Sequence, residues 1–428
     1  MSRRTGSAYL PLHGGRVPQW LATRMASMSR IVIEALVVEY GRDEILRRLA
    51  NPFWFQSFGA VMGMDWHSSG MTTSVLSALR RGLDPVADEL GLYVCGGRGR
   101  ASRATPGQLL EVGEQTGLDG DRLARTSRLV ASVDSSALQD GYQLYLHGFI
   151  VTADGKWTVV QQGMNDDTGL ARRYHWLSEG LRSFVEEPHS ALDGPPGNRI
   201  FNLTDRRASD SRDVQLALVR DGAERFVREF ELIRASEPVL SMPQHHDVRR
   251  SDVRLPRLHA AMAAAEQAAP KDFADLLLVP GVGPRTVEAI ALVAEVMFGA
   301  PSRFDDPARF AFAHGGKDGH PFPVPLDVFD HTLSVLKAAV SKAKLGNSER
   351  MDALKRLNKQ AQLLEAGAKG ESWDNILRAQ TNKVALMGAR SVGNGSSLKA
   401  VRLKSPNALS EPRKARQETH STRQLSLF

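Results

Sequence analysis

The sequence predicts an α+β fold, in which a mixed N-terminal domain with a small antiparallel sheet precedes an all-α unit and a disordered tail. Residues 142–151 alternate between two strand faces, and 157–163 returns after the Asp154-Gly155 turn signal. Beyond residue 256 apolar residues recur at helical spacing. From residue 383 large apolar side chains are few, so this segment cannot bury enough surface to fold alone.

The chain of 428 residues is long enough for two or three domains. Two prolines and a loss of periodicity after residue 236 indicate a linker. The predicted parts are a mixed α/β catalytic domain at 1–235, the linker at 236–255, a helical domain at 256–380 with a helix-hairpin-helix at 273–299, and a basic tail at 381–428.

The composition is that of a soluble cytoplasmic protein. No apolar run is long enough to span a bilayer, and no apolar segment follows the N-terminal arginines as it does in a secretory signal. The single cysteine, Cys95, excludes an internal disulfide framework and fits a reducing compartment. We therefore expect no membrane partner.

The positive charge is concentrated at the C-terminus. Lys and Arg exceed Asp and Glu by seven within 381–428, which equals the formal net charge of +7 for the whole chain. The body is thus neutral overall, and the basic tail favours nucleic acid without specifying its sequence.

Helical patterns dominate the rest of the chain, around an aromatic core segment at 51–59. The predicted helices are 18–40, 71–81, 105–116, 170–181, 213–235, 258–267, 328–345 and 348–364. Asp65-Trp-His-Ser-Ser-Gly70 allows two interpretations, a site built on Asp65 and His67 or a cap for the following helix, and capping is favoured. His245, His246 and Asp247 are a weaker metal-ligand candidate, because their spacing is awkward for one ion.

A short strand from residue 92 leads into a glycine-rich basic loop. Arg98, Arg100 and Arg103 on a flexible backbone suit the phosphates of DNA, and a solvated surface loop is the alternative.

Carboxylates and histidines gather in the segment around the predicted hairpin. Asp134, Asp140, Glu187 and His189 are the candidate catalytic residues, and Asp134, Asp140, Glu187 and His147 are the candidate ligands of Mg²⁺ or Mn²⁺. Hard oxygen ligands hold such ions, which activate water for phosphodiester cleavage. In the alternative interpretation Asp134 caps a turn and Asp140 begins the hairpin.

A glycine-rich turn lies between two apolar helical patterns at 275–299. Gly281, Val282 and Gly283 permit a tight turn, and Arg285 and Thr286 open the second helix, which Thr286 could cap. The stretch resembles the helix-hairpin-helix motif of DNA-repair proteins, which implies that backbone N–H groups hold a DNA phosphate at the helix N-terminus.

Two further resemblances extend over the chain. The terminal peptide Gln424, Leu425, Ser426, Leu427, Phe428 resembles the bacterial sliding-clamp-binding motif, which implies a clamp partner. Residues 4–338 resemble a prokaryotic domain-of-unknown-function family, number seven-six-three. The matching stretches are Leu10-Pro-Leu-His-Gly-Gly15, Asp65-Trp-His-Ser-Ser-Gly70, Val133-Asp-Ser-Ser-Ala-Leu-Gln-Asp-Gly-Tyr-Gln-Leu-Tyr145, Val160-Gln-Gln-Gly-Met-Asn165, Arg173-Tyr-His-Trp176, Glu187-Pro-His-Ser190 and Phe312-Ala-His-Gly-Gly-Lys-Asp-Gly319.

The sequence therefore predicts a DNA-associated protein of repair or replication, with a metal-dependent nuclease as the first hypothesis and a non-catalytic DNA-binding adaptor as the second. The hairpin also resembles that of base-excision glycosylases, whose catalytic Asp lies about twenty residues beyond it. Asp305 and Asp306 are near that spacing, but Pro284 and Arg285 stand where the lyase-type lysine would be.

Overall fold

The computed structural model describes residues 17, 19–64, 70–194, 200–235, 254–308, 326–343 and 346–367. Its elements are α1 (Gln19–Tyr40), α2 (Arg42–Leu49), α3 (Pro52–Val61), α4 (Gly70–Leu83), η1 (Asp84–Val86), α5 (Ala87–Leu90), β1 (Leu92–Arg98), α6 (Arg100–Thr116), α7 (Gly120–Ser132), η2 (Val133–Ala137), β2 (Leu138–Gln139), β3 (Gln143–Thr152), β4 (Trp157–Asn165), β5 (Leu170–Leu177), β6 (Ala191–Asp193), β7 (Phe201–Asn202), η3 (Arg206–Ala208), α8 (Ser209–Arg220), α9 (Ala223–Ala235), α10 (Leu255–Ala268), α11 (Phe273–Leu277), α12 (Pro284–Phe298), α13 (Leu326–Lys342) and α14 (Asn347–Gly367). The predicted α+β class is confirmed. None of the described helices is long and apolar enough to cross a membrane.

An antiparallel sheet of five strands lies at the centre, in the order β1-β3-β4-β5-β6. A second, two-stranded sheet pairs β2 with β7. The predicted hairpin is present, with Val151 opposite Trp157 across its turn. Both faces of the large sheet are covered, because its side chains enter two separate hydrophobic clusters.

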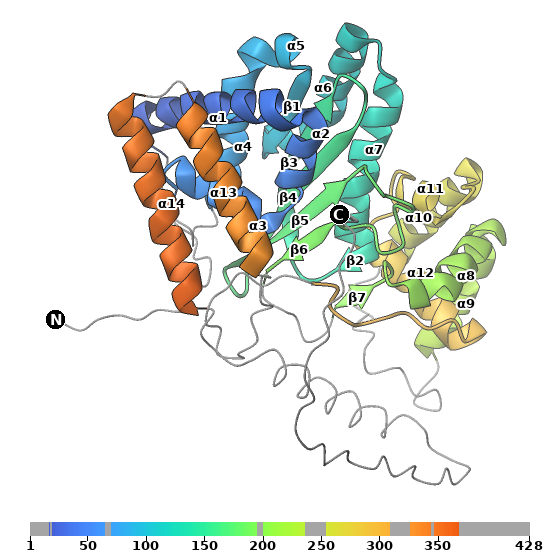
Figure 1. Cartoon of the computed structure of the whole chain (residues 1–428). Coiled ribbons are helices and arrows are strands. Elements are labelled where there is room, and N and C mark those ends of the chain that lie inside the picture. The colour runs from blue at the N-terminus through green and yellow to red at the C-terminus, as the bar shows by residue number, and fades with distance from the viewer. Residues whose placement is uncertain are drawn as a thin grey trace, which may run out of the picture. The chain divides into compact units, whose positions relative to one another are not determined.

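Helices cover the two faces of the sheet in different sets (Figure 1). On one face Phe149, Val159 and Trp176 pack with α6 and α7 and with the helices α8 to α12. On the other face Ile150 and Val160 pack with α1 to α4, α13 and α14. The helices before and after residues 236–253 thus share one core, since Phe226 and Ile290 belong to the same cluster.

The predicted helix at 170–181 is wrong, because residues 170–177 form strand β5. Arg173 and His175 alternate along this strand with Arg172, Tyr174 and Trp176. Side chains on both faces of the strand are buried, and the two arginines pair with the buried carboxylates of Asp140 and Asp193. The sequence of the strand therefore shows no continuous apolar face. Pairing with β4 and β6 therefore decides the conformation.

A bulge changes the predicted alternation of β3. The register shifts between Leu144 and Leu146, so Leu144 packs against the Phe149 cluster and Tyr145 against the opposite one. Beyond the bulge, His147 and Phe149 share a face as predicted.

Several predicted helix boundaries also differ. Helix α6 begins at Arg100 and includes Pro106, so Arg100 and Arg103 lie at the start of a helix and not on a flexible loop, whereas Arg98 is the last residue of β1. The predicted helix 213–235 is two helices, separated at Asp221 and Gly222, where Gly222 has a φ of 100°. In α14 the apolar side chains are not all buried, since Met351 is 52% exposed, whereas Leu357 is buried.

The single cysteine lies within β1. Cys95 is buried against the α6 face of the sheet, and burial raises the pKa of its thiol to about 12. A thiol in this environment is poorly reactive, since the thiolate is the nucleophile.

One buried arginine fastens the segment that follows α12 to the sheet. Arg172 of β5 is fully buried and binds Asp140 at 3.1 Å and Asp306 at 2.7 Å. The Arg303 carbonyl accepts a backbone bond from Asn202 on β7, so the segment runs beside that strand.

Several predicted features lie outside the described residues. They are Asp65 to Ser69, His245, His246 and Asp247, the stretch 312–319, and the terminal peptide 424–428.

Replacing Arg172 with Ala is expected to lower the free energy of unfolding by about 3–5 kcal/mol, because two buried carboxylates lose their counter-charge. Urea unfolding measures this change. Arg47→Ala, which removes an exposed pair with Glu179, is the control and is expected to cost about 1 kcal/mol or less. An equal loss of unfolding free energy in the two variants would contradict the role of Arg172 as the counter-charge of two buried carboxylates.

Candidate functional site

Asp134 lies at the point where helix α7 ends in a single π-helical turn, η2. Its side chain is fully buried and accepts three hydrogen bonds. Trp176 Nε1 and Gln161 Nε2 donate to Oδ2 at 2.9 and 2.5 Å, and His189 Nε2 lies 2.6 Å from Oδ1. Such π turns occur often at functional sites.

A hydrogen-bond chain continues from Asp134 through Gln161 to His147. His147 Nδ1 lies 2.7 Å from Gln161 Oε1, and its Nε2 lies 2.9 Å from Ser127 Oγ. Burial lowers the pKa of His147, which keeps its imidazole neutral. Neutral His147 donates from Nδ1 to the amide oxygen, so Nε2 accepts from the Ser127 hydroxyl.

This chain leaves Asp134 and His147 little capacity to bind a metal. Both ring nitrogens of His147 and both oxygens of Asp134 have protein partners, and neither side chain lines open space. The geometry makes Asp134 an orienting carboxylate, a role that the metal-ligand prediction did not include.

His189 connects this buried chain to a pocket of about 290 Å³. Its ring is almost fully buried, and its Nδ1 has no hydrogen-bond partner in the described part of the chain. The pocket is lined by Glu187, His189, Ala191, Leu192, Asn202, Thr204, Asp205, Arg207, Asp305, Asp306, Pro307 and Ala308.

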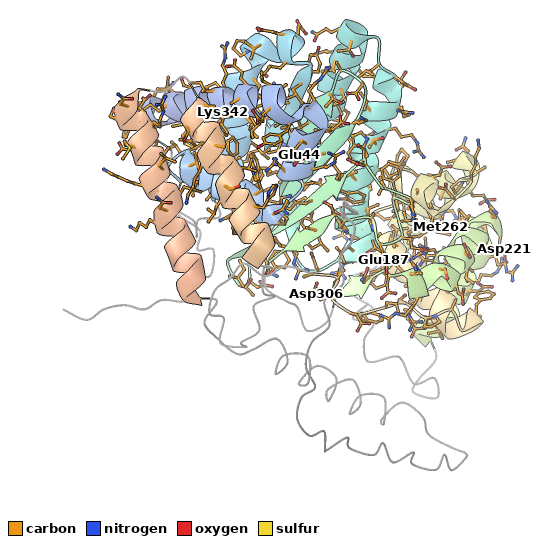
Figure 2. The ribbon with its side chains drawn as sticks, in the orientation of Figure 1. Glu44, Glu187, Asp221, Met262, Asp306 and Lys342 are labelled. Carbon is orange, nitrogen blue, oxygen red and sulfur yellow. The ribbon has the colours of Figure 1, made fainter. Side chains whose placement is uncertain are left out.

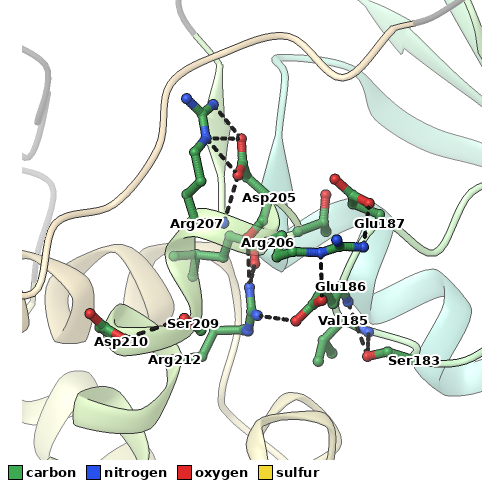
Figure 3. A network of polar contacts seen from close by, with 12 residues as sticks. Ser183, Val185, Glu186, Glu187, Asp205, Arg206, Arg207, Ser209, Asp210 and Arg212 are labelled. Atoms are coloured by element: carbon green, nitrogen blue, oxygen red, sulfur yellow. Dashed lines mark hydrogen bonds and ion pairs between the residues drawn. The ribbon is translucent and has the colours of Figure 1, made fainter.

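Arginines neutralise most of the pocket's carboxylates. Glu187 pairs with Arg206 at 3.1 Å, and Arg207 binds Asp205 (Figure 3). Arg207 also binds Asp305. Glu187 also has a φ of 44°, an uncommon conformation for a residue with a side chain, at the edge of the pocket. Figure 2 labels Glu187 and Asp306, which come from distant parts of the chain.

Asp140 lies apart from the pocket lining. Its carboxylate binds Arg172 and accepts a hydrogen bond from the Tyr174 hydroxyl at 2.7 Å. Burial raises the pKa of Asp140, and Arg172 opposes this shift. The predicted set of Asp134, Asp140, Glu187 and His147 is therefore not gathered around one point.

No three His, Cys, Asp or Glu residues in the described ranges are grouped so that they could hold a metal ion. A requirement for Mg²⁺ or Mn²⁺ thus stays a prediction from the sequence.

The glycine-rich turn joins the short helix α11 to the longer helix α12. Gly281 is exposed with a φ of 93°, a conformation that favours glycine. Gly283 is the N-cap of α12, so Thr286 is not the cap as expected; its hydroxyl lies 3.4 Å from the Gly281 carbonyl. A Cβ at Gly283 would meet nothing within 4 Å, so this end of the helix faces open space.

The N-terminus of α12 carries unpaired donors. The N–H groups of Gly283, Arg285 and Thr286 have no acceptor within the ranges that the structure describes. Val282 N–H is used within the turn, by the Val279 carbonyl at 3.0 Å. Arg285 is exposed and pairs with Glu288 at 2.9 Å.

The turn is connected directly to the Asp134 segment. Gln139 Nε2 donates to the Pro284 carbonyl and to the Ser136 carbonyl, each at 3.0 Å. Helices α11 and α12 also pack against η2. The first residue of α12 is therefore held to the turn that carries Asp134.

The basic residues after β1 are exposed, as contact with DNA requires. Arg98 lies over the Tyr145 ring at 5.5 Å from its centroid, and Arg100 begins α6.

Sequence reasoning missed the partners that define the site. The sequence predicts a helix around Arg172 and Trp176, whereas both lie on β5, and it does not predict the contact of Gln161 with Asp134. The spacing from the hairpin suggests Asp306 only as a glycosylase residue, whereas its carboxylate binds the buried Arg172. The one available signal was the polar character of β4 and β5, whose polar side chains need buried partners.

The family model described as "Protein of unknown function (DUF763)" matches residues 6–324. Neither a curated protein nor a solved structure matches the chain significantly.

The free energy of unfolding is expected to fall as the pH falls from 7 to 5.5. Burial lowers the pKa of both His147 and His175, so the unfolded chain binds protons that the folded chain excludes. Each group adds a slope that approaches about 1.4 kcal/mol per pH unit below its ordinary pKa.

Urea unfolding at several pH values measures this slope. His175→Asn can keep the donor to the Leu49 carbonyl but does not titrate, so its slope should be shallower. An unchanged slope would refute the role of His175.

Proposed function

We propose that the chain, which belongs to the DUF763 family, is a DNA-binding protein of repair or replication. It holds a DNA phosphate at the turn 279–286. The single observation that carries the proposal is the open N-terminus of α12. The N–H groups of Gly283, Arg285 and Thr286 have no acceptor among the described residues. A Cβ at Gly283 would meet nothing within 4 Å. An anion is favoured there by the unpaired donors and by the helix dipole.

The electrostatics near the turn agree with this assignment. Lys271, before α11, and Arg285, at the start of α12, are exposed. Arg285 pairs with Glu288, and no side chain caps α12. Because the body is neutral overall, backbone donors and these few cations have to provide the local attraction, while the basic tail adds a nonspecific contribution.

The terminal peptide 424–428 is proposed to recruit the protein to the bacterial sliding clamp. Two leucines and a phenylalanine end a polar, basic segment and offer apolar anchors. The tail would act as a tether that raises the local concentration of the hairpin at clamp-loaded DNA, so a weak peptide suffices.

A nuclease activity is the second candidate, and the contact of His189 with Asp134 beside the pocket favours it. Release of labelled fragments from duplex, flap or single-stranded DNA with Mg²⁺ or Mn²⁺ is its test. DNA binding without any release would support the non-catalytic adaptor.

Gly283→Asp is expected to weaken duplex binding at least tenfold relative to Gly283→Asn, because only Asp places a negative charge beside the phosphate site. Both side chains fit without a clash and can cap α12, so both variants should keep wild-type stability. Fluorescence anisotropy at fixed salt measures the affinity. Equal affinities of the two variants would exclude this turn as the phosphate site.

Deleting residues 424–428 is expected to abolish binding to the sliding clamp and to leave duplex binding by the body intact. Surface plasmon resonance with purified clamp measures the first and anisotropy the second. Leu425→Ala with Phe428→Ala removes the anchors at constant length and should reproduce the deletion. Clamp binding that persists in both variants would refute the assignment.

A further inference from the structure

The pocket beside β6 and β7 is lined by His189, a residue that the hairpin and the tail do not explain. We propose that His189 Nδ1 is the proton acceptor of a phosphodiester-hydrolysing site, and that Asp134 acts through it by fixing its tautomer. The choice of substrate class rests on the proposed function in DNA binding, whereas the tautomer rests on the described contacts alone.

The tautomer follows from the donors around Asp134. Trp176 Nε1 can only donate a hydrogen bond, so Oδ2 of Asp134 accepts from it at 2.9 Å. Gln161 Nε2 donates to the same oxygen. The carboxylate is thus held as an acceptor, and His189 Nε2 donates to Oδ1 at 2.6 Å. A neutral ring then carries its lone pair on Nδ1.

The Asp134 carboxylate fixes the orientation of the Gln161 amide, because only the NH₂ group can donate to it. Gln161 Oε1 then faces His147 Nδ1, which donates to it, and His147 Nε2 accepts from the Ser127 hydroxyl. A reversed amide would place its oxygen against the carboxylate oxygen, where neither group can donate. Ser127, His147 and Gln161 are buried, and the polar groups that link them have hydrogen-bond partners. Each of them therefore donates to the next in the direction of Asp134.

The pocket is suited to one phosphodiester group with its nucleophile. Its volume of about 290 Å³ exceeds that of a phosphate and a water molecule, and Arg207 supplies an exposed guanidinium at its edge. Each of the four carboxylates in the lining is paired with an arginine, which reduces their repulsion of an anionic substrate.

The hydrolytic step requires only water, the diester and His189. A water oxygen forms a bond to phosphorus while one water proton passes to His189 Nδ1. The bond between phosphorus and the leaving sugar oxygen breaks with its electron pair, and that oxygen takes a proton from solvent. His189 then returns its proton to solvent, and no electron transfer occurs. Proton acceptance by a positioned histidine typically accelerates such steps by about 10²–10⁴-fold.

The position of the hairpin connects this pocket with bound DNA. Gln139 holds the Pro284 carbonyl to the Ser136 carbonyl, two residues from Asp134. A strand held at the N-terminus of α12 is therefore attached to the segment that orients His189.

The first experiment measures the tautomer. Nitrogen-15 NMR of histidine-labelled full-length protein, assigned by comparison with His189→Gln, should show His189 protonated at Nε2 alone. In Asp134→Asn, Trp176 and Gln161 require the amide oxygen at the former Oδ2, so the amide NH₂ faces His189. We expect His189 to change to the Nδ1–H tautomer there. An Nδ1–H tautomer in the wild type would overturn the proposal.

The second experiment measures hydrolysis of bis(4-nitrophenyl) phosphate and of labelled DNA, with Mg²⁺ or Mn²⁺ present. His189→Gln and Asp134→Asn should each lower kcat at least 100-fold on both substrates, with DNA affinity unchanged. His259→Gln, which alters an exposed histidine paired with Glu224, is the control and should keep the wild-type rate.

The outcomes separate this inference from the proposed function. Hydrolysis of the small diester that depends on His189 supports the inference even if DNA binding fails. Equal rates for the wild type and His189→Gln would overturn the role of His189 and leave the proposed DNA binding untouched. DNA binding without hydrolysis of either substrate would overturn the role of His189 in the same way.

Discussion

The burial of the Asp134 carboxylate is the constraint on which the centre of the molecule depends. An ionised group without water needs partners on every side, and its three come from β4, from β5 and from the loop before β6. Satisfying one charge thus aligns the end of α7 with two strands and a loop. Arg172 imposes a similar requirement nearby, since two carboxylates distant in sequence must both reach it.

Local periodicity predicts those elements that expose one polar face or follow a turn signal. The hairpin of β3 and β4 and helices α1, α4, α13 and α14 could be predicted in this way, with small errors at their ends. Strand β5 could not, because both of its faces are buried and its charges are paired inside the protein. The bulge in β3 likewise depends on how β3 pairs with β4, which the sequence of β3 alone does not determine.

The candidate site could likewise be predicted only in part from the sequence. Asp134, Glu187 and His189 could be selected from their chemistry and their density along the chain, and His189 does meet Asp134. Their grouping around a metal depends on the tertiary structure, which gives Asp134 and His147 protein partners instead. Asp305 and Asp306 enter the pocket from beyond α12, a contact that spans more than one hundred residues.

The burial of Cys95 has a practical consequence for studying motion in this protein. The chain contains one cysteine, and its thiol lies inside the core with a raised pKa. A cysteine placed at an exposed position such as 285 or 351 is therefore the main reactive thiol for maleimide chemistry without removal of the native residue. Pairs of such labels would turn distances between the α12 turn and helix α14 into spectroscopic signals, with little background labelling of Cys95.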